Sequence, residues 1–171
     1  MSERIETTAI RNLIHNEEYC RKVLPFIKEE YFTDRLEKLI FTEIYGFVNK
    51  YNNLPTKESL SIEMNTNKGV SEGEYKKMNE IISSLNPEPI NLDWLVETTE
   101  TWCKDRAIHN AILGGIQIID GKDKEHTPEY LPEMLSEALS VSFDQKVGHD
   151  YLLESKERFD YYNRKEERLE L

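Results

Sequence analysis

The chain has 171 residues, of which 38% are hydrophobic and only 7 are Gly and 6 Pro. This composition describes a folded, helix-rich protein of one domain, or one domain with an appendage, and excludes a disordered or fibrous one. The 22 Lys and Arg are interleaved with 33 Asp and Glu, for a formal charge of −11, so the surface is expected to repel DNA, because nucleic-acid binders cluster their cations.

The sequence predicts a soluble intracellular protein. Cys20 and Cys103 form no CxxC pair, which leaves no zinc knuckle or redox motif and is typical of reduced cytosolic thiols. No N-terminal apolar run resembles a signal peptide, and no stretch of about 18 apolar residues is available to span a bilayer.

Helical periodicity dominates and no convincing strand pattern occurs, so the predicted fold class is all-α. The first helix is expected over residues 6–15. The second is expected over residues 17–24 and ends at Pro25, because proline cannot continue a helix interior. A dense apolar patch after this proline is expected to fill the core: Phe26, Ile27, Tyr31 and Phe32.

Three further helix starts carry capping signals. Asp34 followed by Glu37, and Ser71 followed by Glu74, both fit a capping box, and Thr56 is a good N-cap residue. The third helix is expected to place one apolar face inward: Leu36, Ile40, Ile44, Phe47, Val48 and Tyr51. The helices that start at Thr56 and Ser71 are expected to reach about residues 64 and 85.

A boundary is expected at Pro87 and Pro89, because prolines and the residues before them disfavour helix. Nothing then interrupts a helix over 91–120, which Gly121 ends in the manner of a C′ residue. A return helix over 127–143, with Thr127-Pro128 or Leu131-Pro132 at its start, completes a long antiparallel hairpin. The predicted division is a compact helical head at 1–89, a helical hairpin at 90–144, and a linker with the start of a linker helix at 145–171.

Small residues spaced by four, Ala107, Ala111 and Gly115, lie along one face of the long helix. They predict close approach of a second helix, although ordinary helix composition is the alternative. Further on, Leu152, Phe159 and Tyr162 share one stripe of an amphipathic helix at about 150–164. This stripe predicts a docking element for another copy or another domain; the alternative is that it folds back on its own core.

No motif for chemistry is complete. Gly121-Lys122 fails as a phosphate-binding loop, because Ile116 stands where GxxxxGK[ST] needs its first Gly and Asp123 where it needs Ser or Thr. Asp105 and His109 are four residues apart, but no second such pair exists to complete a metal site. We therefore expect no catalytic, cofactor-binding or metal-binding residues in this chain.

Several strings of residues nevertheless resemble a known family, the N-terminal domain of DnaB-type replicative helicases. The strings are Asn12–Asn16, Val23–Ile27, Glu30–Phe32, Ile40-Phe41 and Leu54–Thr56. A second set is similar to the helicases of T-even-type tailed phages: Asp93–Val96, Arg106-Ala107, Leu139–Asp144 and Val147–Asp150. The resemblance covers essentially the whole chain and is most specific toward its C-terminal end.

The resemblance implies a part of an ATP-dependent DNA helicase that acts in DNA replication. ATP and Mg would bind a motor domain beyond Leu171, so no enzyme activity is expected of this chain by itself. N-terminal domains of this family pair through their hairpins into dimers that build a hexameric collar, and they contact primase and a helicase loader. DNA would be held mainly by the motor, no membrane is involved, and the location would be the cytoplasm of an infected host cell.

Two surfaces follow for this chain. The hairpin is expected to carry self-association through Ala107, Ala111, Ile112, Gly115, Leu135 and Leu139. The linker helix would dock on a neighbouring subunit through Leu152, Phe159 and Tyr162. Two rival hypotheses stay open at this point: a free-standing helical adaptor without a motor, and a metal-dependent helical enzyme built around Asp105 and His109.

Overall fold

The computed structural model describes residues 4–143, and every regular element among them is helical. All of the described elements belong to one compact unit, Met1–Val141. In chain order they are α1 (Ile5–His15), α2 (Glu17–Val23), η1 (Leu24–Phe26), η2 (Glu29–Tyr31), α3 (Arg35–Tyr51), α4 (Lys57–Asn65), α5 (Glu72–Ser84), α6 (Leu92–Ile119), η3 (Pro128–Tyr130) and α7 (Leu131–Leu139). The predicted all-α class is confirmed.

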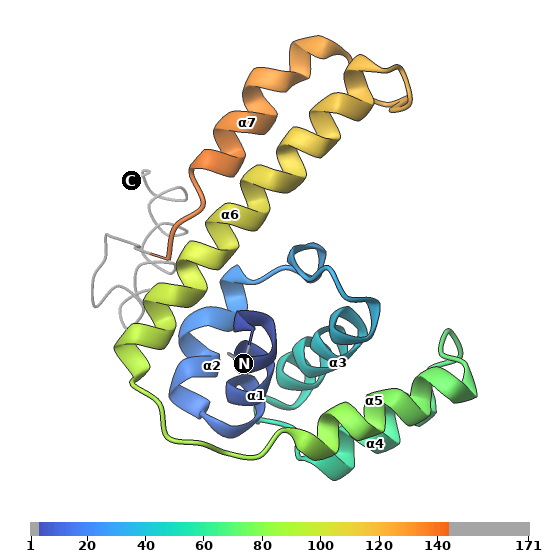
Figure 1. Cartoon of the computed structure of the whole chain (residues 1–171), viewed down its shortest axis with the longest axis vertical. Coiled ribbons are helices and arrows are strands. Elements are labelled where there is room, and N and C mark those ends of the chain that lie inside the picture. The colour runs from blue at the N-terminus through green and yellow to red at the C-terminus, as the bar shows by residue number, and fades with distance from the viewer. Residues whose placement is uncertain (1–3, 144–171) are drawn as a thin grey trace, which may run out of the picture. The chain divides into compact units, whose positions relative to one another are not determined.

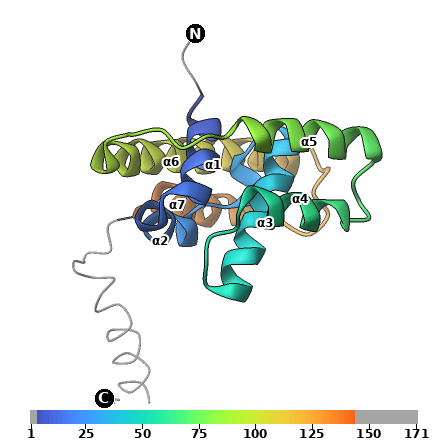
Figure 2. The ribbon, with the colours of Figure 1, turned by 90° about the horizontal axis from the view of Figure 1, so that it is seen from below.

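The head is built around α1, which packs against α2, α3 and α6 (Figure 1). Its buried face consists of Ala9, Ile10, Leu13 and Ile14. The α4–α5 pair packs on α3, and both views show these two helices side by side (Figures 1 and 2). His15 at the end of α1 lies 2.6 Å from the Leu85 carbonyl through its Nε2 atom, which connects α1 to the end of α5.

The short segment after α2 fills the core largely as predicted. Ile27, Tyr31 and Phe32 are buried, whereas Phe26 is only half-buried. The Phe32 ring lies 5.1 Å from Phe41 and 5.0 Å from Trp102 between ring centroids, in the range favoured by aromatic pairs. This cluster joins α3, the segment around η2 and α6.

The capping signals locate the helix starts correctly. Thr56 with Ser59 and Ser71 with Glu74 both form complete capping boxes. Asp34 accepts a hydrogen bond from the Glu37 N–H at 3.0 Å, but the Glu37 side chain does not return it. Its carboxylate instead accepts hydrogen bonds from Arg4 and from the Thr7 hydroxyl, so the predicted Asp34 capping box forms only by half.

The prediction of which α3 residues face inward is confirmed at the centre of the helix and wrong at its last residue. Ile40 and Ile44 are fully buried, and Leu36, Phe47 and Val48 are half-buried. Tyr51 is 47% exposed, and its ring packs against Phe47 with the ring centroids 4.7 Å apart.

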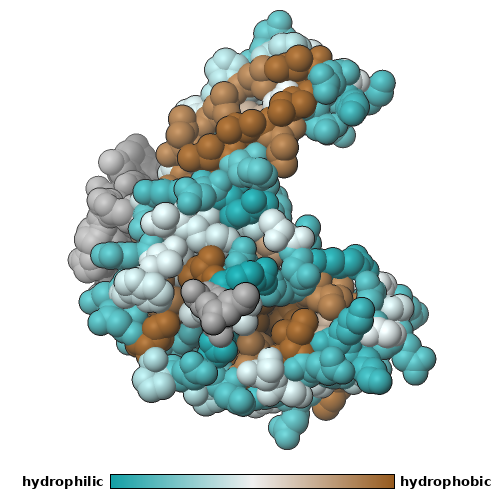
Figure 3. Space-filling model, viewed as in Figure 1, coloured by the Kyte–Doolittle hydropathy of each residue, from teal (hydrophilic) through white to brown (hydrophobic). Residues whose placement is uncertain are grey.

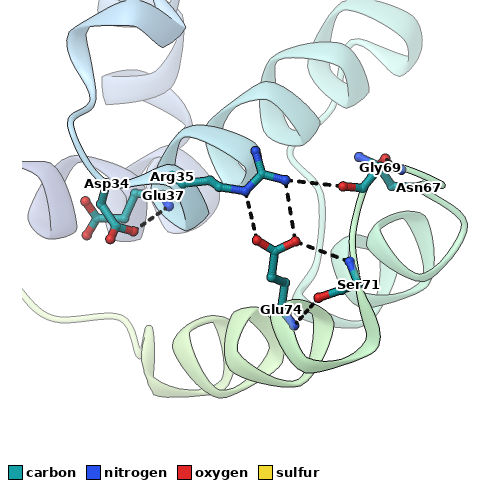
Figure 4. A network of polar contacts seen from close by, with 7 residues as sticks. All are labelled: Asp34, Arg35, Glu37, Asn67, Gly69, Ser71 and Glu74. Carbon is teal, nitrogen blue, oxygen red and sulfur yellow. Dashed lines mark hydrogen bonds and ion pairs between the residues drawn. The ribbon is translucent and has the colours of Figure 1, made fainter.

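A polar network connects the starts of α3 and α5 (Figure 4). Arg35 donates from Nε to Glu74 Oε2 at 2.8 Å and from Nη2 to the Gly69 carbonyl at 3.2 Å. Glu74 also accepts from the Ser71 N–H at 3.2 Å within its capping box. The Arg35 guanidinium and the Ser71 N–H together lower the pKa of the Glu74 carboxyl.

The hairpin begins and turns where the sequence predicts. Asn91 caps α6 by accepting from the Trp94 N–H at 2.8 Å. Gly121 follows the helix at φ 77°, a left-handed conformation that glycine adopts without a steric penalty. The Gly121 N–H donates to the Ile118 carbonyl and the Lys122 N–H to the Gln117 carbonyl, the paired bonds of a Schellman motif.

The return arm is shorter than predicted. The expected helix over 127–143 is in fact the short η3 followed by α7, which has 9 residues and ends at Leu139, against 28 residues for α6. Pro128 and Pro132 both lie in first turns, where proline is tolerated. Figure 1 shows α7 alongside the distal part of α6. The proposed domain division at residues 89 and 144 stays a prediction.

A first prediction concerns the packing of α6 on α7. Ala111 is buried between them, so Ala111→Leu should destabilise the protein by about 1–3 kcal/mol through overpacking. Thermal unfolding measures this as a lower midpoint. Gln117→Leu introduces the same side chain at an exposed position of α6 and should leave the midpoint nearly unchanged. Equal midpoints for Ala111→Leu and the unmodified protein would contradict the close packing.

A second prediction concerns pH. Because the folded pKa of Glu74 lies below its ordinary value of 4.5, ionised Glu74 stabilises the folded state above that pH, and this contribution is lost as pH falls through the folded pKa. The difference in unfolding midpoint between the unmodified protein and Glu74→Gln should therefore be constant near neutrality and shrink below pH 4.5. A difference that grows on acidification would show that the Arg35 contact does not lower the pKa.

Candidate interaction surface on the helical hairpin

The distal part of α6 lacks charge on all of its sides. Residues 107–119 contain no Asp, Glu, Lys or Arg, although 32% of the whole chain is charged. A helix that packs on one partner normally shows a polar opposite face. Here the polar residues are only His109, Asn110 and Gln117, and the short helix α7 covers one side, so some apolar side chains of this stretch stay exposed among the described residues.

The side of α6 that faces α7 carries its smallest residues. A Cβ atom at Gly115 would lie 3.1 Å from Leu131 Cδ2, and one at Gly114 would lie 3.6 Å from the Met134 methyl. Ala111 and Ile118 are buried on the same side, as is Ala138 of α7. The predicted close approach of a second helix at Ala111 and Gly115 therefore occurs inside the hairpin.

The next side of α6 is apolar and exposed. Ile112, Ile116 and Ile119 are 51%, 46% and 67% exposed. At about 100° per residue they form one stripe, adjacent to Gly115. Leu113 is also exposed, at 49%, but lies about 100° further around the helix from Ile112.

On α7 a second stripe continues this surface. Leu135 and Leu139 are 39% and 68% exposed and follow Leu131 at spacings of four. Since Leu131 contacts Gly115 whereas Met134 contacts Gly114, the Leu135 stripe lies on the same edge of the α6–α7 contact as the Ile116 stripe. We call the combined surface the apolar face: Ile112, Ile116, Ile119, Leu135 and Leu139. Hydrophobic residues are seen to gather over the hairpin in Figure 3.

The acidic residues of α7 lie away from the apolar face. Glu133 and Glu137 are exposed and, by helical spacing, lie on the Met134 side of α7. The hairpin thus has one uncharged edge and one acidic edge. Asp120 is exposed one turn beyond Ile116 and borders the uncharged edge. Burial of the apolar face does not require burial of Glu133 or Glu137, which keeps its cost low.

The turn between the two arms is held by its own polar contacts. Asp123 accepts hydrogen bonds from the backbone N–H groups of Glu125 and His126, at 2.8 and 3.1 Å. The His126 ring lies 2.9 Å from Asp123 through Nδ1 and stacks on Tyr130 at 4.4 Å. These contacts lower the pKa of the Asp123 carboxyl, and the hydrogen bond with the His126 side chain has the largest effect.

The structure separates the six residues predicted for self-association into two groups. Ile112, Leu135 and Leu139 lie on the exposed apolar face, whereas Ala111 and Gly115 face α7. Ala107 is half-buried and lines a groove of about 240 Å³ between η2, α6 and α7. Sequence reasoning missed Ile116 and Ile119, although their spacing of four and seven from Ile112 was a usable signal. The role of all six in association stays a prediction.

The other candidate sites gain no support. Asp105 and His109 are both exposed on α6, and within residues 4–143 no three His, Cys, Asp or Glu residues gather in a way that would hold a metal ion. Among the described helices, none has the length and apolarity needed to cross a membrane. Leu152, Phe159 and Tyr162 lie outside the described residues, so the predicted docking stripe stays a prediction.

Comparison with known proteins finds sequence similarity to a helicase. No family model matches it. It is 32% identical over 164 residues to a protein described as a DnaB-like replicative helicase, from Enterobacteria phage T4. The match covers 91% of this chain but only 34% of the relative, so the chain spans about a third of the relative's length. The resemblance to this helicase family that the sequence indicated is thereby confirmed.

A third prediction tests the turn that joins the two arms. Gly121→Ala should destabilise the protein by about 1 kcal/mol, because alanine tolerates the left-handed conformation at Gly121 poorly. Gly73→Ala is the matched control, since no atom lies within 4 Å of a Cβ at this position, near the start of α5. Chemical denaturation measures both. Equal stability of the two variants would contradict the Gly121 conformation.

Proposed function

We propose that this chain is the N-terminal assembly and protein-interaction domain, the collar domain, of a hexameric phage replicative DNA helicase. The similarity to the phage T4 helicase over most of the chain supports the replicative role. The uncharged, exposed apolar face of the hairpin supports the assembly role and is the observation that carries it. ATP and Mg would act in a motor domain outside this chain, which would also hold the DNA.

A second copy of the chain fits the apolar face best. Two identical faces bring together only uncharged side chains, and a two-fold axis allows one surface to complement itself. Each of the five side chains contributes roughly 1 kcal/mol when about half of its surface leaves water. A face of this size is smaller than a standard protein interface, so the isolated chain should associate weakly and the full hexamer should rely on further contacts.

Charge sets the conditions for this association. Each copy carries a formal charge of −11, so two copies repel one another over a Debye length of about 10 Å at 0.1 M salt. Because the face itself holds no charge, added salt screens the repulsion without weakening the contact. Association through the apolar face should therefore become stronger as salt is raised.

The proposed partners follow from the similarity. A collar on a replicative helicase would contact primase and a helicase loader, and its dimers would build the hexamer. Its place would be the cytoplasm of an infected host cell. The acidic surface suits a collar that lies near DNA without gripping it, since clustered cations are absent from the sequence pattern.

A fourth prediction tests the apolar face directly. Ile116→Lys should weaken self-association at least about ten-fold, because it places a charge in the centre of the contact. Sedimentation equilibrium at tens of micromolar protein and at two salt concentrations measures the association constant. Ile62→Lys is the control, because Ile62 is exposed on α4 in the head, away from the hairpin, and it should associate as the unmodified protein does.

Two outcomes would refute the proposed assembly role. One is an unmodified chain that stays strictly monomeric at high protein and high salt concentration. The other is an equal loss of association in Ile116→Lys and Ile62→Lys, which would show that loss of any exposed apolar side chain has this effect and that the hairpin holds no defined face.

A further inference from the structure

Two side chains of α6 reach back to the head at the base of the hairpin. Arg106 donates from Nε to the Tyr31 carbonyl at 2.8 Å, and Asn110 donates from Nδ2 to the Glu30 carbonyl at 3.0 Å. Arg106 also donates from Nη2 to the Asn110 Oδ1 atom at 3.2 Å, which orients the Asn110 amide. The acceptors are backbone carbonyls, so these bonds hold the η2 turn itself.

These bonds extend the attachment of α6 beyond the apolar core. Trp102 and Cys103 are the last residues of α6 buried in the head. Arg106 and Asn110 follow one and two turns later and lengthen the attached part of α6 by about 10 Å. Beyond Asn110 the buried residues of α6 face α7.

The η2 turn has open space on both of its sides. A groove of about 240 Å³ separates it from α7, and a second of about 430 Å³ separates it from α3; Lys28 and Glu30 line both grooves. On the α3 side, Glu29 accepts a hydrogen bond from the Thr42 hydroxyl at 2.8 Å. Tyr31 of η2 is nonetheless buried, and its ring packs edge-on against Trp102. The polar bonds therefore add to this packing at the Lys28 and Glu30 part of the turn, where the two grooves leave it less closely packed.

We propose that Arg106 and Asn110 are positioning residues that latch η2 to the base of the hairpin and so fix the direction in which the head carries the apolar face. The guanidinium suits this task because its planar fork donates to two acceptors at once. The consequence for assembly rests on the proposed function, since hairpin direction then sets the angle between associated copies. The direction itself is a property of the single chain.

The experiment measures hairpin direction within one molecule. Spin labels on Glu18→Cys in α2 and Lys124→Cys in the hairpin turn report the head-to-hairpin distance, and dilution with unlabelled protein removes signals between molecules. Arg106→Met keeps an apolar stem of similar length but removes the donors. We expect its distance distribution to shift or to broaden roughly two-fold. The Tyr31 and Phe32 amides, bonded within η2, should exchange with deuterium faster.

Two comparisons separate positioning from general stability. Lys104→Met makes a similar change on an exposed side of α6, where Lys104 only pairs with Glu100 at 3.8 Å, and should leave distances and exchange unchanged. Arg106→Lys should restore most of the original distribution, because the ammonium still donates one bond to the Tyr31 carbonyl. If Arg106→Met does not fold, Asn110→Ala provides the same readouts with one bond removed.

An unchanged distance distribution in Arg106→Met, or an equal change in Lys104→Met, would overturn the latch. These results do not depend on self-association. A chain that is monomeric in sedimentation, but whose distances change in Arg106→Met, would refute the assembly role and support the latch. A chain that associates, but whose distances do not change in Arg106→Met, would refute the latch and support the assembly role.

Discussion

The lack of charge along residues 107–119 of α6 is the constraint on which the rest of the hairpin depends. Apart from His109, Asn110 and Gln117, this stretch is apolar or small, and its apolar residues lie on more than one side of the helix. The intramolecular partner α7 has only 9 residues and takes the side with Ala111 and Gly115. The neighbouring side, with Ile112 and Ile116, stays exposed. An interaction surface therefore arises from the mismatch in length between the two arms.

The head holds the helix that carries this surface in a fixed position. One helix, α6, is a core element in its first half and carries the proposed interaction surface in its second half. Its first half is held by Leu95, Thr99 and Cys103, which are fully buried, and by the Trp102 ring against Phe32. Rigid elements present binding residues more accurately than loops do. Packing of the first half of α6 in the head thus fixes the position of its second half in the hairpin.

The similarity to a phage replicative helicase agrees with a stable helical head that carries an exposed apolar surface. An interaction domain needs a stable core, an exposed face free of charge, and acids elsewhere that keep it soluble and prevent unspecific association. The chain shows all three, since its acidic Glu133 and Glu137 lie on the edge of the hairpin opposite to the apolar face.

The sequence by itself determined the all-α class and most helix boundaries, because caps such as Ser71 and Asn91 and the stop at Gly121 act within a few residues. It did not determine where the Glu37 carboxylate binds, since its partner Arg4 is distant in sequence. It also could not assign the sides of α6, because periodicity identifies an inner face only when the opposite face is polar. With residues 107–119 uncharged, only the tertiary contact with Leu131 and Met134 decided which side is buried and which stays exposed.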